Sequence, residues 1–136
     1  MKESTKAKIA LFSGRYDRVH LGHIISLQRL AQKYAMVLVV ILDYPEQQYS
    51  IKYRTQMLCE CLSMCKGTFQ VVVNKEHFGK ITKEELEKFR FDVYCSGNHQ
   101  CLKHIEDLGY EVEFVERAYD YQATDDRKWQ QIKEVL

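Results

Sequence analysis

Seven consecutive apolar residues, Met36–Leu42, most strongly constrain the fold of this chain. The run is rich in β-branched side chains and is too short for a membrane span. Because neighbouring residues of a strand point to opposite faces of a sheet, an uninterrupted apolar run predicts a strand that is covered on both faces. Strands of this kind belong to parallel sheets, so the run predicts a central parallel strand.

The segments around this run alternate between strand-like and helix-like patterns. Capping signals support three of the helices: Thr82 and Glu85 form a capping box, Gly109 ends the fourth helix, and Thr124 can cap the last one. The alternation predicts a single α/β domain over residues 1–136, with a five-stranded, doubly wound parallel sheet and helices on both faces. The predicted strands are Ile9–Phe12, Met36–Leu42, Phe69–Val73, Phe91–Cys95 and Glu111–Val115, and the predicted helices are His20–Tyr34, Tyr53–Met64, Thr82–Phe89, Gln100–Leu108 and Asp125–Leu136.

The segment between the first strand and the first helix is the main candidate for a binding site. Gly14 to His23 reads GRYDRVHLGH, so His20 and His23 share one face of the first helical turn, with Gly22 between them. A helix N-terminus attracts anions, phosphate above all, and glycine lets a bulky anion come close. Two alternatives compete with this interpretation: histidines that serve only the packing, and a zinc site, which is weaker because the usual helical pair is i,i+4 and no third ligand is apparent.

A second candidate loop, Cys95–His99, follows the fourth strand. Ligands of doubly wound sheets bind beyond the carboxyl ends of the strands, where the winding direction reverses. If the first and fourth strands are neighbours, both loops face one shared crevice.

Composition excludes several classes of protein. A net charge of +1 and a pI of about 7.6 give no global case for binding nucleic acid or a membrane. We therefore expect a soluble, cytoplasmic protein. Five cysteines without a signal peptide indicate reduced thiols. On the predicted helix Cys61 and Cys65 share a face while Cys59 points elsewhere, which favours buried thiols over a metal site.

GRYDRVHLGH resembles the first signature of the cytidylyltransferase-like nucleotidyltransferases, Gly-x-Phe-Asp-x-x-His-x-Gly-His, with Tyr16 in place of Phe. Further landmarks of this Rossmann-like superfamily occur in the same order along the whole chain: Arg54 after the second strand, Ser96 and Gly97 after the fourth, and Arg117 after the fifth. Residues 122–127 resemble the second signature more weakly. The resemblance implies an enzyme in which a small phosphorylated molecule attacks the α-phosphate of a nucleoside triphosphate and releases pyrophosphate.

The resemblance also implies roles for individual residues. His20, His23 and Arg117 would be catalytic, with Arg54, Lys52 and Tyr121 binding the substrate. Mg²⁺ would arrive with the nucleoside triphosphate, no metal would be held by the protein itself, and the chain would form a homodimer. The implied nucleotide-binding residues are Phe12, Ser13, Gly14, Arg15, Tyr16, Asp17, Gly22, Ser96, Gly97, Asn98, Thr124 and Arg127.

Three functions remain open at this stage. The size of the chain and the place of Arg117 resemble glycerol-3-phosphate cytidylyltransferase, which implies CTP and glycerol 3-phosphate. Gly14-Arg15-Tyr16 also resembles archaeal-type nicotinamide mononucleotide adenylyltransferases, which implies ATP. A nucleotide-binding module with little turnover is the third, because residues 43–50 contain no lysine and Gln122 and Ala123 replace hydroxyl residues.

Overall fold

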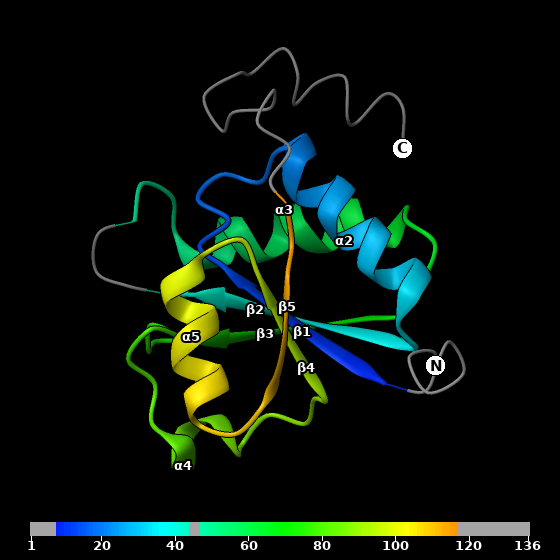
Figure 1. The fold of residues 1–136 in the computed structure, drawn as a ribbon. Coiled ribbons are helices and arrows are strands. Elements are labelled where there is room, and N and C mark those ends of the chain that lie inside the picture. Colours follow the sequence, from blue (N-terminus) through cyan, green and yellow to red (C-terminus); the bar gives the residue numbers. More distant parts are fainter. Residues whose placement is uncertain (1–7, 44–46, 117–136) are drawn as a thin grey trace.

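The computed structural model describes residues 8–43 and 47–116. They form alternating strands and helices in the order that the sequence predicts (Figure 1). The last predicted helix and its cap, Thr124, lie outside the described residues. The elements are β1 (Ile9–Gly14), α2 (Leu21–Lys33), β2 (Met36–Leu42), α3 (Ile51–Ser63), β3 (Phe69–Asn74), α4 (Lys83–Leu86), β4 (Val93–Ser96), α5 (His99–Asp107) and β5 (Glu111–Phe114).

The five strands of the described residues form one parallel sheet in the order β3-β2-β1-β4-β5. The chain first moves outward from β1 to β3 and then returns to the other side of β1 with β4. The winding direction therefore reverses between β1 and β4, which meets the condition for the two loops to share one edge. This pair is where a doubly wound sheet binds its ligands.

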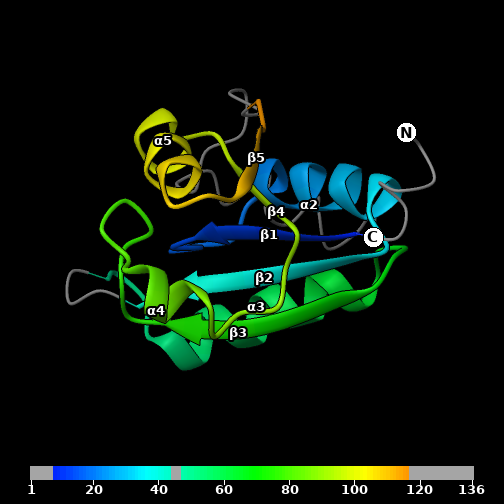
Figure 2. The same cartoon turned by 60° about the horizontal axis from the view of Figure 1, so that its bottom comes forward.

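Helices cover both faces of the sheet (Figures 1 and 2). The apolar sides of α2 and α3 pack with Val37, Val39 and Ile41 in one core cluster, and those of α4 and α5 pack with Leu38, Val40 and Leu42 in the other. The alternating side chains of β2 thus enter two separate cores. This division explains why the strand is apolar without interruption.

Element boundaries differ from the prediction by a few residues, most clearly around β4. The strand begins at Val93 rather than Phe91, because ladder pairing with β1 starts at the pair Ala10 and Val93. Asp92, just before the strand, is engaged by Ile9: its backbone N–H donates to the Ile9 carbonyl, and its carboxylate accepts from the Ile9 N–H at 2.7 Å. Within the described residues, no helix is both long and apolar enough to cross a membrane.

Candidate functional site

The loops that follow β1 and β4 meet at the carboxyl edge of the sheet. Parallel pairing sets Phe12 beside Cys95, so the next residues of the two strands leave the sheet side by side. A hydrogen bond of 3.1 Å between Ser13 Oγ and Tyr94 Oη joins the strands near this edge. The two loops that are expected from the sequence to share a crevice therefore leave the sheet side by side.

His20 is the N-cap of α2, and its side chain takes part in the cap. Its backbone is extended, and Nδ1 accepts a hydrogen bond from the backbone N–H of Gly22 at 3.1 Å. Its carbonyl accepts from the N–H groups of His23 and Ile24. Three of the first amides of the helix are thus already satisfied within the protein, so what this turn offers an anion is the imidazole rings rather than these amides.

His23 completes the cap in the opposite direction. Its Nδ1 accepts from the backbone N–H of His20 at 3.2 Å, which makes a capping box from two histidines. The two rings stack, with centroids 3.8 Å apart and planes 21° apart. Because a neutral imidazole that accepts at Nδ1 carries its proton at Nε2, the backbone selects the same tautomer for both rings.

The charge state of His20 follows from its surroundings. Burial lowers the pKa of His20 below its ordinary value, because a cation is poorly solvated there. At neutral pH its ring is uncharged and presents Nε2–H as a donor at a fixed place. A fixed donor of this kind stabilises negative charge that grows during a reaction, since it needs no reorganisation.

The buried ring of Tyr16 packs against His23 in the histidine turn. The ring centroids of Tyr16 and His23 are 4.7 Å apart, and the Tyr16 side chain is only 1% exposed. A Cβ on Gly14 would lie 3.1 Å from the Tyr16 ring, so glycine there makes room for the tyrosine. The ring of Tyr16 belongs to the core next to the histidine turn, and its predicted contact with the nucleotide stays a prediction.

The hydroxyl of Tyr16 is buried, and no described residue forms a hydrogen bond with it. A buried polar group without a partner costs stability. We therefore expect Tyr16→Phe to raise the free energy of unfolding by about 1 kcal/mol. Urea unfolding followed by circular dichroism measures this change. A less stable Tyr16→Phe protein would mean that the hydroxyl has a partner.

Asp17 ties the histidine turn to the segment before α3. Its carboxylate oxygens accept from the backbone N–H groups of Gln48 at 2.7 Å and of Tyr49 at 2.8 Å. Both oxygens are directed to protein amides, and the predicted contact of Asp17 with the nucleotide stays a prediction. Asp17 instead aligns one loop of the carboxyl edge with another.

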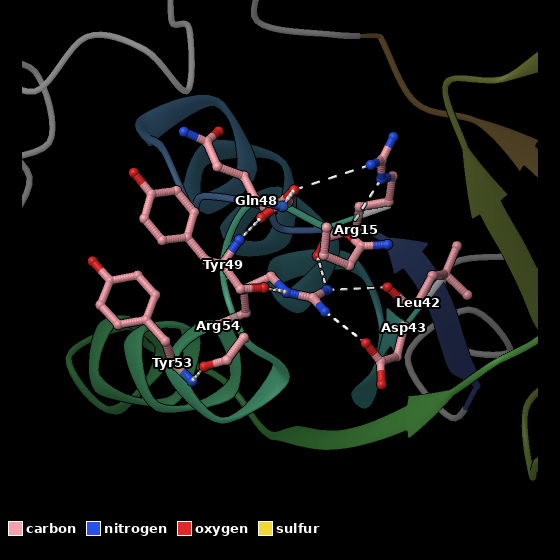
Figure 3. Close-up of polar contacts among 10 residues, drawn as sticks. Arg15, Leu42, Asp43, Gln48, Tyr49, Tyr53 and Arg54 are labelled. Carbon is pink, nitrogen blue, oxygen red and sulfur yellow. Dashed lines mark hydrogen bonds and ion pairs between the residues drawn. The ribbon is translucent and has the colours of Figure 1, made fainter. Parts of the chain in front are cut away.

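Arg54 lies on the first turn of α3 and links this helix back to the loop after β1 (Figure 3). Its side chain is buried, with only 1% of the residue exposed. Its guanidinium ion-pairs with the carboxylate of Asp43 at 2.8 Å. Its other bonds reach carbonyl oxygens of Tyr49 (3.0 Å), Arg15 (2.8 Å) and Leu42 (3.0 Å).

These contacts are all with the protein itself, and the predicted role of Arg54 in binding the substrate stays a prediction. All three nitrogens of the guanidinium are used by the protein, and the side chain does not reach the surface. The fork holds the ends of β1 and β2 against the start of α3. Arg15 and Lys52 are exposed nearby, so their predicted roles toward phosphates remain open to them.

The loop after β4 is organised by its own side chains. Ser96 Oγ accepts from the N–H of Asn98 at 3.0 Å. Asn98 Oδ1 in turn accepts from the N–H groups of Gln100 and Cys101 and caps α5. The side-chain oxygen of Asn98 is thus used by the cap, and the predicted role of Asn98 in binding the nucleotide stays a prediction. Gly97, between these residues, is half-buried.

One feature of this edge had no signal in the sequence. His99 and Phe114 lie far apart along the chain, and no spacing singles them out. In the structure their rings stack, with centroids 4.8 Å and planes 6° apart. Only the pairing of β4 with β5, which sets Ser96 beside Phe114, brings them together.

Cys59 and Cys61 lie on α3, and Cys65 follows just after the end of that helix. Cys59 is exposed and Cys61 is buried, while the thiol of Cys65 donates to the carbonyl of Cys61 at 3.4 Å. Burial raises the pKa of Cys65, so that thiol stays protonated. Across residues 8–43 and 47–116, no three histidine, cysteine or acidic side chains gather as metal ligands.

Four of the predicted site residues, Arg117, Tyr121, Thr124 and Arg127, lie outside the described residues, and their roles stay predictions. Phe12, also predicted to bind nucleotide, is half-buried and packs against the core under α2 and α3. The described site therefore consists of the two histidines, the exposed cations near them and the loop after β4.

The sequence of this chain is similar to those of two phosphopantetheine adenylyltransferases. A phosphopantetheine adenylyltransferase of Bdellovibrio bacteriovorus is 27% identical over 108 residues, which cover 78% of this chain and 62% of that protein. A phosphopantetheine adenylyltransferase of Gloeothece citriformis is 33% identical over 55 residues, or 39% of this chain and 35% of that protein. The chain thus spans less than two thirds of the length of either relative.

A solved structure shares the fold. The bifunctional NMN adenylyltransferase/ADP-ribose pyrophosphatase of Francisella tularensis, solved with AMP and a manganese ion, superposes with a TM-score of 0.63 at 16% identity, covering 87% of this chain and 39% of that one. The model of the cytidylyltransferase-like family matches residues 11–134, nearly the entire sequence. This chain therefore belongs to the cytidylyltransferase-like family.

Proposed function

We propose that this chain is a nucleotidyltransferase that transfers an adenylyl group from ATP to a small phosphorylated acceptor and releases pyrophosphate. The relatives named above are adenylyltransferases, which favours ATP over the CTP and glycerol 3-phosphate that the chain's size suggested. The family model matches residues 11–134, a range that includes the histidine turn, so we assign the transfer step to this domain.

The pair of pinned imidazoles is the observation that carries the proposal. Each ring is held at Nδ1 by a backbone amide, which directs the proton to Nε2. In the reaction an oxygen of the acceptor's phosphate forms a bond to the α-phosphorus of ATP while the bond from that phosphorus to the bridging oxygen breaks. The leaving group is pyrophosphate, and negative charge grows on the oxygens around the α-phosphorus.

The protein contributes position and charge neutralisation to this step, because in-line phosphoryl chemistry makes little covalent demand on it. The Nε2–H groups of His20 and His23 donate to oxygens of the α-phosphate. Asp17 and Arg54 hold the flanking loop in register with the histidine turn. Exposed Arg15 and Lys52 supply positive charge for the acceptor's phosphate, and Arg117 and Arg127 are proposed for the remaining phosphates.

Mg²⁺ would supply charge neutralisation on the triphosphate. Asp17 and Asp43, two carboxylates at this edge, already face protein donors. Because these carboxylates are already engaged by the protein, the residues present fit a metal ion that would be held by phosphate oxygens and would enter with the nucleotide.

Pyrophosphate release tests the function. The purified chain is incubated with ATP or CTP, Mg²⁺ and one of three acceptors: 4′-phosphopantetheine, nicotinamide mononucleotide or glycerol 3-phosphate. We expect release with ATP and one of the first two acceptors. Release with CTP and glycerol 3-phosphate would reverse the base assignment. Tight nucleotide binding without release for any pair would support the module without turnover.

A further inference from the structure

The stacked rings of His99 and Phe114 form a small aromatic surface, here called the aromatic shelf, at the carboxyl edge of the sheet. His99 is the first residue of α5, and Phe114 is the last residue of β5 and 47% exposed. Single exposed apolar side chains are ordinary on soluble proteins. Phe114, however, lies at the edge where a doubly wound sheet binds ligands, which makes it a candidate for ligand contact.

The shelf is fixed to the loop after β4. The pairing of β4 with β5 sets Phe114 beside Ser96, and the N–H of Val115 donates to the Ser96 carbonyl at 2.9 Å. Asn98 caps the helix that begins at His99. Each ring is therefore attached to ordered backbone. A rigid aromatic surface binds a flat partner at little cost in conformational entropy.

The charges near the shelf favour an uncharged flat partner over a phosphate. Glu113 precedes Phe114, and its side chain points to the other face of β5, where it accepts from the hydroxyl of Tyr34 and pairs with Lys33 at 2.8 Å. Lys33 therefore neutralises the acidic neighbour away from the shelf. What the shelf presents is the π faces and edges of two rings.

The strand order sets how far the shelf lies from the end of β1, the strand that leads into the histidine turn. β4 lies between β1 and β5, so the shelf is two strand spacings, about 10 Å, from the end of β1. A nucleotide that lies across the edge with its α-phosphate at His20 and His23 has its ribose over β4 and its base over β5.

We propose that the aromatic shelf stacks on the base of the nucleoside triphosphate and that it selects adenine over cytosine. The selection follows from area, because a purine covers more of two rings than a pyrimidine does. The inference rests on the proposed function and adds two residues to it. Stacking on aromatic side chains contributes substantially to binding of each base in other nucleotide-binding proteins.

Binding affinities of three ligands separate the shelf from the rest of the site. Isothermal titration calorimetry measures the Kd of ATP, CTP and inorganic tripolyphosphate for the unmodified chain and for Phe114→Ala and His99→Ala. We expect each substitution to weaken ATP about tenfold, to weaken CTP less, and to leave tripolyphosphate unchanged. Val73→Ala is the control, because Val73 is 44% exposed on β3 at the opposite edge of the sheet.

The outcomes distinguish the shelf from the proposed function. If the unmodified chain binds ATP and the ratio of the ATP and tripolyphosphate Kd values stays the same in both variants, the rings only join α5 to β5 and the shelf proposal is wrong. An equal loss for CTP and ATP overturns the selection of adenine. If the unmodified chain binds no nucleotide, the proposed function fails first. Phe114→Leu, which keeps the apolar contact, replaces Phe114→Ala if that variant does not fold.

Discussion

Replacing His20 or His23 by alanine is expected to lower kcat about a hundredfold or more, the size of effect seen when one preorganised donor is lost. The reason is the Nε2–H of each ring, which the backbone bond at Nδ1 holds in place. Steady-state pyrophosphate release under saturating substrates measures the loss. Turnover close to that of the unmodified chain in either variant would remove that histidine from the chemistry.

His20 also caps α2, so its two contributions need separate variants. His20→Ala removes the acceptor for the Gly22 N–H and should cost about 1 kcal/mol of stability in addition to activity. His20→Asn restores a good capping residue without the imidazole. We expect the asparagine variant to recover the stability, measured by urea unfolding, while kcat stays low. If kcat recovered together with the stability, His20 would act only through the helix.

Arg54→Ala is expected to lower the free energy of unfolding by about 3 kcal/mol, because removing one partner of a buried ion pair leaves the other charge and several carbonyls poorly compensated. Arg54→Lys keeps the charge and loses the planar fork that reaches four acceptors at once, so we expect a smaller loss. Chemical denaturation of both variants in the absence of ATP measures these losses of stability.

Arg90→Ala is the matched control, because Arg90 is exposed and its removal should change stability by less than about 0.5 kcal/mol. The kinetics provide a second readout. If Arg54 held the acceptor, Arg54→Lys would raise the KM of the acceptor at unchanged stability. That pattern would contradict the structural role assigned to Arg54 here.

The order of the elements was accessible from the sequence because it depends on short-range patterns. The apolar run of β2, the helical spacing after His20 and the capping box at Thr82 each report on a few neighbouring residues. The place where the winding reverses followed from the sequence only on the condition that the first and fourth strands are neighbours. Given that condition, the two loops lie at one edge, since parallel strands end on the same side of the sheet.

The partners of individual side chains depended on the tertiary structure. An arginine offers the same fork to a phosphate or to carbonyl oxygens, and only the packing of β1, β2 and α3 around Arg54 decided between them. Burial of Tyr16 and the use of Asp17 by distant amides have the same origin.

What the sequence alone determined is therefore the fold class, the sheet edge at which the candidate site lies and the histidine pair within one turn, because these follow from local periodicity and from the rules of parallel winding. Tertiary structure decided which polar groups are used by the protein and which face outward, and it created the contact between His99 and Phe114. Those features depend on segments that approach one another only after the sheet has formed, and no spacing along the chain encodes their geometry.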